Sequence, residues 1–218
     1  MITLYHCDGA RSFRPLWMLE ELGLAYELKM LPFPPRVFAK DYLALNPLGT
    51  IPLMIDGNTR MTESSGICHY LGIKHGPTPL MVSPDEGAYG AFLNWMYFSD
   101  ATLTFPQTLV PRYSQLEPEE RRNPQVATDY AKWFLGRLRA VEAATANAET
   151  LCAGRFTVAD IVIGYALRLA DTIGLSKDFG PNAAAYWARL QQREGYQRAV
   201  AAERRAGQEQ NVAPRVRA

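Results

Sequence analysis

The sequence has few cysteines, no long hydrophobic run and almost no net charge, and each shortage argues against a class of protein. The cysteines Cys7, Cys68 and Cys152 are far apart, with neither a CxxC nor a metal-ligand spacing. We therefore expect free thiols in a reducing cytoplasm and no metal site. No run approaches about eighteen apolar residues, and no basic segment followed by an apolar one opens the chain, so no membrane span or secretion signal is predicted.

The charge balance points to a small partner. The 218 residues include 23 Lys+Arg and 22 Asp+Glu, for a formal net charge of +1. Such a balance gives no general attraction to nucleic acid or to an anionic membrane surface. We expect the partner to be a small molecule or another subunit, and the length suits one large domain or two small ones.

The start of the chain alternates between strand and helix patterns. Residues 2–5 alternate as a strand, and residues 12–22 carry apolar side chains at helical spacing. Gly23 is a natural stop for that helix, and residues 26–31 alternate as a second strand. The order strand, helix, strand predicts a parallel pair joined by a right-handed crossover.

A hairpin and a further helix are predicted next. Residues 51–61 indicate two antiparallel strands across the turn Asp56-Gly57-Asn58. Ser64 or Ser65 is expected to cap the helix that follows, which Pro77 ends.

The rest of the chain carries only helical patterns. Apolar residues at helical spacing fall in residues 89–111, 126–141, 158–169 and 186–190. We expect an α/β domain at residues 1–77, a linker at 78–86 and an all-helical domain at 87–218. The polar, arginine-rich tail from Glu203 to Ala218 is expected to be either an ordered flap or a frayed end.

Four stretches, taken in order, resemble the cytosolic glutathione transferase family, and the segment Leu93–Asp100 resembles its bacterial and fungal members in particular. The four stretches are Trp17–Glu27, Asn46–Leu53, Thr62–Ile67 and Gly154–Asp160. In the last stretch, Thr157 is expected to cap a helix while Asp160 returns the bond. The resemblance spans essentially the whole chain and implies a thioredoxin-like α/β N-terminal domain, an all-α helical bundle and a homodimer.

The same resemblance implies a glutathione site in the first domain. It implies that the Ile51–Pro52 bond is cis, leaving the backbone of Ile51 free to pair with the peptide. Glu63 can accept from the γ-glutamyl ammonium, and Ser64, at the start of a helix, can hold the neighbouring carboxylate. Lys40 is a candidate for the glycine carboxylate, and Ser65 is expected only to cap the helix.

The group that polarises the glutathione sulfur departs from the family pattern. Gly9, Ala10 or Arg11 stands where Ser- and Cys-type members carry the active group. Ser12 is the nearest hydroxyl, although a serine at this place is also a good N-cap. Arg11 would lower the thiol pKa directly, although it could equally be a solvated turn charge.

Two other residues near the first strand are weaker candidates. Tyr5 aligns with the tyrosine of Tyr-type members, but a strand tyrosine is more often a core residue. Cys7 would change the reaction to thiol–disulfide exchange, but it lies two residues too early, and we expect it to be a buried small hydrophobe.

The implied activity is conjugation of glutathione to a small hydrophobic electrophile, a detoxification chemistry. Peroxide or disulfide reduction could use the same thiolate. Tyr97, Asp100 and Thr104 lie where the family lines its second-substrate pocket. The alternative is a non-catalytic glutathione-binding carrier or interaction module on the same fold. Glutathione is expected as the substrate, with no metal, nucleic-acid or membrane partner.

Overall fold

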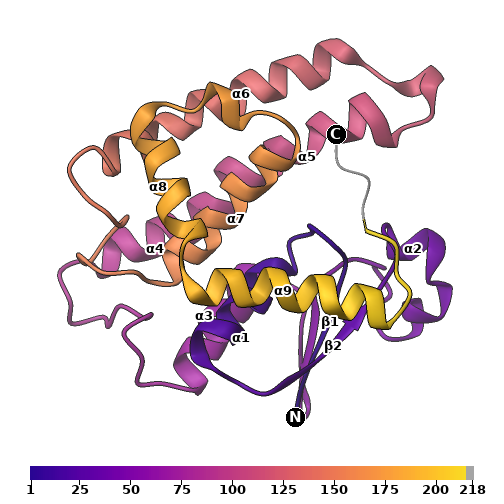
Figure 1. Cartoon of the computed structure of the whole chain (residues 1–218), viewed down its shortest axis with the longest axis horizontal. Coiled ribbons are helices and arrows are strands. Elements are labelled where there is room, and N and C mark those ends of the chain that lie inside the picture. The colour runs from indigo at the N-terminus through magenta and orange to yellow at the C-terminus, as the bar shows by residue number, and fades with distance from the viewer. Residues whose placement is uncertain (215–218) are drawn as a thin grey trace. The chain divides into compact units, whose positions relative to one another are not determined.

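The computed structural model describes residues 1–214 and divides the chain into two compact units (Figure 1). The first unit contains Met1–Met81 and the chain from Gln191 through the last helix. The second unit contains Val82–Leu190. This grouping differs from the expected division at its C-terminal end, because the last helix packs against the first helix of the α/β unit.

The first unit is built around a four-stranded mixed sheet with the strand order β2-β1-β3-β4. Its elements are β1 (Ile2–His6), α1 (Phe13–Leu22), β2 (Tyr26–Met30), α2 (Pro35–Phe38), a 3₁₀ helix (Lys40–Ala44), β3 (Leu53–Asp56), β4 (Thr59–Met61), α3 (Ser64–Lys74) and α9 (Glu194–Glu209). β1 pairs in parallel with β2, whereas the β1–β3 and β3–β4 pairs are antiparallel. The predicted parallel pair and the predicted hairpin are both confirmed.

Two glycines end elements where the sequence pattern predicted a stop or a turn. Gly23 follows α1 with φ +64°, and Gly57 lies in the β3–β4 turn with φ +59°. Both are in the left-handed region, where a residue without a Cβ avoids a steric penalty. These two positions therefore fix the length of α1 and the register of the hairpin.

The start of α3 differs from the prediction. Glu63 occupies the N-cap position, and no side chain makes the capping bond. Ser64 is the first helical residue, and its hydroxyl accepts instead from Arg14 at 2.9 Å. The predicted cap by Ser64 or Ser65 is therefore wrong, because Arg14 on α1 engages the Ser64 hydroxyl.

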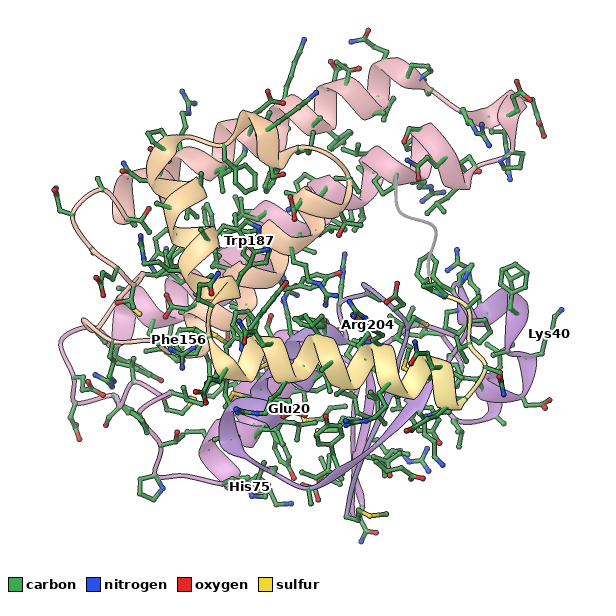
Figure 2. The ribbon with its side chains drawn as sticks, viewed as in Figure 1. Glu20, Lys40, His75, Phe156, Trp187 and Arg204 are labelled. Carbon is green, nitrogen blue, oxygen red and sulfur yellow. The ribbon has the colours of Figure 1, made fainter. Side chains whose placement is uncertain are left out.

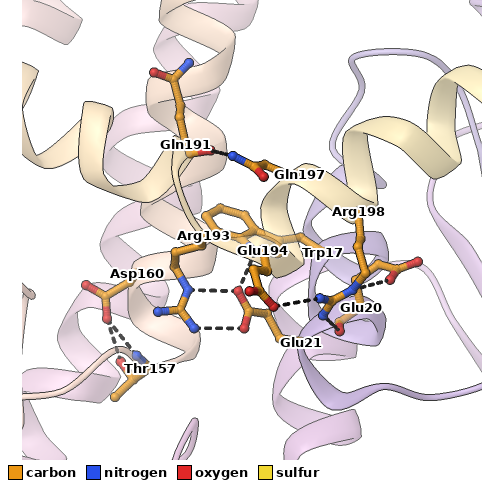
Figure 3. A network of polar contacts seen from close by, with 10 residues as sticks. All are labelled: Trp17, Glu20, Glu21, Thr157, Asp160, Gln191, Arg193, Glu194, Gln197 and Arg198. Atoms are coloured by element: carbon orange, nitrogen blue, oxygen red, sulfur yellow. Dashed lines mark hydrogen bonds and ion pairs between the residues drawn. The ribbon is translucent and has the colours of Figure 1, made fainter.

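Helix α9 packs on α1 and is bound at several points along its length. Arg193 donates from Nε and Nη2 to the two carboxylate oxygens of Glu21, each at 2.9 Å (Figure 3). Arg198 donates to the Glu20 carbonyl at 2.7 Å, and the Tyr196 ring meets the Trp17 ring edge-on.

The far end of α9 reaches the outer edge of the sheet. The Gln210 amide donates to Leu28 O and accepts from Met30 N, each at 2.8 Å, so it pairs with the edge strand β2. Residues 203–209 are helical, which makes the ordered alternative correct for this part of the tail. The end of the predicted tail, residues 215–218, lies outside the described residues.

The second unit consists of helices and loops between residues 82 and 190. They are α4 (Tyr89–Tyr97), a π-helical segment (Phe98–Thr104), α5 (Phe105–Pro111), a π-helical turn (Arg112–Leu116), a 3₁₀ turn (Glu119–Arg121), α6 (Pro124–Ala144), α7 (Val158–Thr172), a 3₁₀ turn (Ser176–Asp178) and α8 (Pro181–Gln191). Buried α7 forms the centre of this unit, and its backbone accepts hydrogen bonds from Ser99 and Gln107.

The predicted capping box at the start of α7 is present. Asp160 is buried, and its Oδ2 accepts from Thr157 N at 2.8 Å. Its Oδ1 accepts from Leu151 N at 3.0 Å and from the Tyr186 hydroxyl at 2.8 Å. One carboxylate thus ties the preceding loop, the helix start and α8 together.

Two kinds of feature are absent from residues 1–214. No helix there is long and apolar enough to cross a membrane, and no group of three or more His, Cys, Asp or Glu residues is arranged to hold a metal ion. Cys7, Cys68 and Cys152, which all lie in this part of the chain, are buried and form no disulfide, as expected from their spacing.

Candidate functional site

Three segments of the first unit meet at one end of its sheet. The end of β1 lies beside the start of β3, where Tyr5 pairs with Leu53, and the start of β3 lies beside the end of β4, where Met54 pairs with Met61. Residues 7–12, 50–52 and 62–64 enter or leave the sheet at this end, and β2, which is parallel to β1, also ends there. The topology therefore gathers Arg11, Ile51 and Ser64 around one end of the sheet.

The segment before β3 is fixed by hydrogen bonds to the Thr50 carbonyl. The Ile51–Pro52 peptide is cis, as predicted. The Thr50 carbonyl accepts from the Tyr42 hydroxyl and from Asn46 Nδ2, each at 2.8 Å. Pairing with β1 begins only at Leu53, so the backbone of Ile51 lies outside the strand ladder.

The start of α3 offers an acid beside a cluster of donors. Glu63 is exposed, whereas Ser64 is 4% exposed and Arg14 is fully buried. Arg14 Nη1 donates to Ser64 Oγ at 2.9 Å, which fixes the hydroxyl and adds positive charge behind it. An ammonium group near Glu63 and a carboxylate near the first N–H groups of α3 would both find complementary charge here.

Ser12 lies inside a buried network. Its hydroxyl is 2.6 Å from His6 Nδ1, and the other ring nitrogen, Nε2, is 2.9 Å from Glu203 Oε1 on α9. Glu203 Oε1 also accepts from Gly9 N at 2.8 Å. Ser12 has no exposed surface, so its hydroxyl is not open to a ligand in this structure.

The order of groups Ser12, His6, Glu203 is that of a nucleophilic serine triad. A nucleophile must reach a substrate, and all three side chains are buried, with Ser12 and His6 fully enclosed. In this structure the network is therefore closed to a substrate.

Arg11 is the positively charged side chain of the 7–12 loop, and it stays partly exposed. It directly precedes the first turn of α1, whose N–H groups also favour negative charge. Tyr5 packs its ring 5.4 Å from that of Tyr42, which fits a structural role. Cys7 is fully buried, as expected.

The remaining predicted residues are dispersed. Lys40 is exposed at the start of the 3₁₀ helix whose Tyr42 holds Thr50, and its side chain points outward (Figure 2). In the second unit, Tyr97 ends α4 with 72% exposure. Asp100 and Thr104 follow in the π-helical segment, where Asp100 is half-buried and Thr104 is fully buried.

Sequence reasoning missed three buried polar residues of this region: His6, Arg14 and Glu203. His6 is in phase with the buried residues Ile2 and Leu4 of β1, which was a signal for its burial. Glu203 lies among the buried residues of an otherwise polar helix, which was a similar signal. Nothing in the sequence pairs these residues with one another.

A groove of about 490 Å³ lies elsewhere in the first unit, between β2 and α9. Its lining includes Glu20, Tyr26, Arg205 and Glu209, and it contains none of the predicted site residues. The groove is therefore separate from the sheet end described above.

Comparison with known proteins agrees with the resemblance. A family model described as the glutathione S-transferase N-terminal domain matches residues 10–72. Glutathione S-transferase hmp2 of Hypomyces subiculosus is 31% identical, over 62% of this chain and 68% of that protein. Glutathione S-transferase GstA of Escherichia coli O157:H7 is 27% identical, over 93% and 98%. The solved glutathione transferase URE2P6 from Phanerochaete chrysosporium, in complex with oxidized glutathione, has a TM-score of 0.81 at 26% identity, covering 94% of this chain and 97% of that one.

Proposed function

Because the chain belongs to the glutathione S-transferase family of enzymes, with a thioredoxin-like unit followed by helices, we propose that it activates the glutathione thiol for attack on a small hydrophobic electrophile. The observation that carries this proposal is the convergence of Arg11, Ile51 and Ser64 at one end of the sheet. Each of the three segments offers a different part of glutathione a suitable partner.

The peptide part of glutathione would bind along the segment before β3 and the start of α3. The free backbone of Ile51, next to Pro52, would pair with the cysteinyl residue. Glu63 would accept from the γ-glutamyl ammonium, and Ser64, held by Arg14, would donate to the carboxylate. Lys40, which is exposed, would hold the glycine carboxylate from the side of the 3₁₀ helix.

The thiol would lie at the start of α1. Arg11 and the helix N-terminus both favour the thiolate over the thiol, so the pKa of the bound thiol falls and its proton leaves to solvent. The thiolate then attacks an electrophilic carbon and forms the new C–S bond; in a substitution the leaving group departs with the electron pair of its bond to that carbon, and in an addition the π pair moves to the neighbouring atom, which takes a proton from solvent. Ser12 was the other candidate, but its complete burial and its bond to His6 support a positioning role.

The second substrate would meet the helical unit. Tyr97, with its exposed ring, and Asp100 are the side chains proposed to contact it. The complete burial of Thr104 argues for a supporting role at that position. The same thiolate could reduce a peroxide or a disulfide.

The proposal also includes two properties that the family resemblance implies: the chain forms a homodimer, and it is located in the cytoplasm.

One observation favours a second candidate, a glutathione-binding carrier without turnover. The loop of residues 7–12 presents no open hydroxyl or thiol, because Cys7 and Ser12 are both fully buried. If Arg11 does not reach the sulfur, the site would bind glutathione without activating it.

The deciding experiment is an ultraviolet titration of the glutathione thiolate on the purified protein between about pH 5 and 9. A bound thiol with a pKa well below about 8.5 supports the transferase. Binding with an unshifted pKa supports the carrier, and absence of binding overturns both.

The role of Arg11 is tested by its own variants. Arg11→Ala should raise the thiol pKa by about one unit, and Arg11→Lys should restore part of the effect. Arg139→Ala, which removes an exposed charge on α6, is the matched control and should leave the titration unchanged. If Arg11→Ala behaves like this control, Arg11 does not stabilise the thiolate.

A further inference from the structure

Glu203 is a carboxylate in an unusual position for a helix surface. It is 3% exposed and lies on the buried face of α9 with Tyr196, Ala199 and Ala206. Removing an ionised carboxylate from water costs several kcal/mol unless hydrogen bonds replace the lost hydration. The partners of Glu203 therefore indicate what its burial achieves.

Two of those partners, His6 and Gly9, lie at the end of β1 and in the segment that links β1 to α1. Glu203 Oε1 accepts from Gly9 N at 2.8 Å and is 2.9 Å from His6 Nε2. His6 Nδ1 is 2.6 Å from Ser12 Oγ, which also accepts from Cys7 N at 3.4 Å. One carboxylate thus connects, directly or through His6, to backbone and side-chain groups along the whole loop.

The network has a consistent arrangement of protons. With the proton of His6 on Nε2, the imidazole donates to Glu203, and Nδ1 accepts from the Ser12 hydroxyl. The Ser12 oxygen is then free to accept from Cys7 N. Because Ser12 is engaged in this way, it makes no capping bond to α1, although it occupies the N-cap position.

The loop held by the network is the loop that carries Arg11. Gly9 has φ +64°, so the chain bends at the residue whose N–H donates to Glu203. Arg11 lies between this anchored glycine and the anchored Ser12. The direction in which the Arg11 side chain and the first N–H groups of α1 point therefore depends on both anchors.

We propose that Glu203 is a positioning residue for the start of α1, where the glutathione sulfur would lie. Glu203 acts through Gly9 and His6 to fix the conformation of residues 7–12. This inference rests on the proposed function, because it assigns the thiolate to the start of α1. It makes α9, the last helix of the chain, part of the machinery that lowers the thiol pKa.

Two variants of Glu203 separate positioning from simple folding. Glu203→Gln keeps the size of the side chain and one carbonyl oxygen that can accept from Gly9, whereas Glu203→Ala removes every acceptor. Arg193→Ala is the control, because it loosens α9 at Glu21 without touching the loop. Circular dichroism and thermal unfolding establish that each variant is folded.

The readouts are the pKa of the bound glutathione thiol and the Kd of S-methylglutathione, which has no ionisable thiol. We expect Glu203→Ala to raise the thiol pKa by about one unit, a roughly tenfold smaller thiolate fraction near neutral pH, with Glu203→Gln in between. The Kd of S-methylglutathione should change less than about threefold in every variant. Arg193→Ala should leave the thiol pKa unchanged.

Amide hydrogen exchange of the ligand-free protein tests the loop directly, so the inference stays testable even if Glu203→Ala does not fold. Glu203→Gln should speed exchange in residues 7–12 relative to the wild type, and Arg193→Ala should not. Folded Glu203 variants with the wild-type thiol pKa, or with unchanged loop exchange, overturn this inference alone. A wild-type protein whose bound thiol has an unshifted pKa overturns the proposed function and this inference with it.

Discussion

The replacement Asp160→Asn tests how strongly one buried carboxylate supports the helical unit. Four donors point at its two oxygens: Leu151 N and the Tyr186 hydroxyl at Oδ1, and the backbone N–H and hydroxyl of Thr157 at Oδ2 (Figure 3 shows the Thr157 pair). Asparagine has nearly the same shape but only one acceptor oxygen. Its amide would face the two donors on one side, and both would lose their partner.

The expected loss follows from those two donors. Each buried donor left without an acceptor costs about 1 to 3 kcal/mol. Burial opposes the charge and raises the pKa of Asp160, so removing the charge returns part of that loss. We therefore expect the free energy of unfolding to fall by about 2 to 3 kcal/mol and the Tm by about 5 to 10 °C.

The assay is urea unfolding at pH 7 followed by circular dichroism, with the wild type and a matched control. Asp129→Asn makes the same chemical change at an exposed position of α6, where the carboxylate accepts from Gln125 Nε2 at 2.8 Å. The control should change the unfolding free energy by less than about 0.5 kcal/mol. A loss below about 1 kcal/mol for Asp160→Asn, with an unchanged urea slope, would refute the reasoning.

Three further changes have defined outcomes. Hydrogen bonds from Arg155 and from Ser83 N lower the pKa of Glu86 to about 2. The ionised Glu86 carboxylate therefore stabilises the fold above its unfolded-state pKa, and this stabilisation is lost as the pH falls toward 2. Glu86→Gln should remove this part of the acid dependence when the free energy of unfolding is measured across pH. Gly49→Ala would place a Cβ atom 2.6 Å from Arg36 Cβ, at a residue with φ +58°. Calorimetry should then show weaker glutathione binding, and urea unfolding should show a free energy of unfolding that is lower by about 2 kcal/mol. Gly57→Ala, where the new Cβ atom would have no atom within 4 Å, is the control and should leave glutathione binding unchanged. Arg193→Ala should lower the unfolding free energy by about 1 kcal/mol in the same assay, because the ion pair with Glu21 is partly buried.

The elements that the sequence predicted correctly are those set by local patterns. The stop at Gly23, the turn at Gly57 and the capping box of Thr157 and Asp160 each depend on residues within a few positions of one another. Backbone propensity and hydrogen bonding within a few consecutive residues do not depend on the rest of the fold. They can therefore be predicted without knowing which helix packs on which strand.

The prediction was wrong where a distant side chain competes for a local group. Ser64 has the residue type of an N-cap, but Arg14, fifty positions earlier, donates to its hydroxyl. Ser12 occupies an N-cap position, yet His6 takes its hydroxyl. In both cases a buried side chain engages the serine hydroxyl, and only the tertiary structure reveals that partner.

Asp160 and Glu203 perform the same physical task at different distances along the chain. Each is a buried helical carboxylate that accepts from a backbone N–H in the segment leading into a helix. Asp160 reaches Thr157, three positions away, and this spacing is a known motif. Glu203 reaches Gly9, 194 positions away, and no motif encodes such a separation. The signal common to both is a carboxylate in phase with the apolar face of a helix. On α9 this signal indicates that the carboxylate accepts a hydrogen bond from a buried donor elsewhere in the chain.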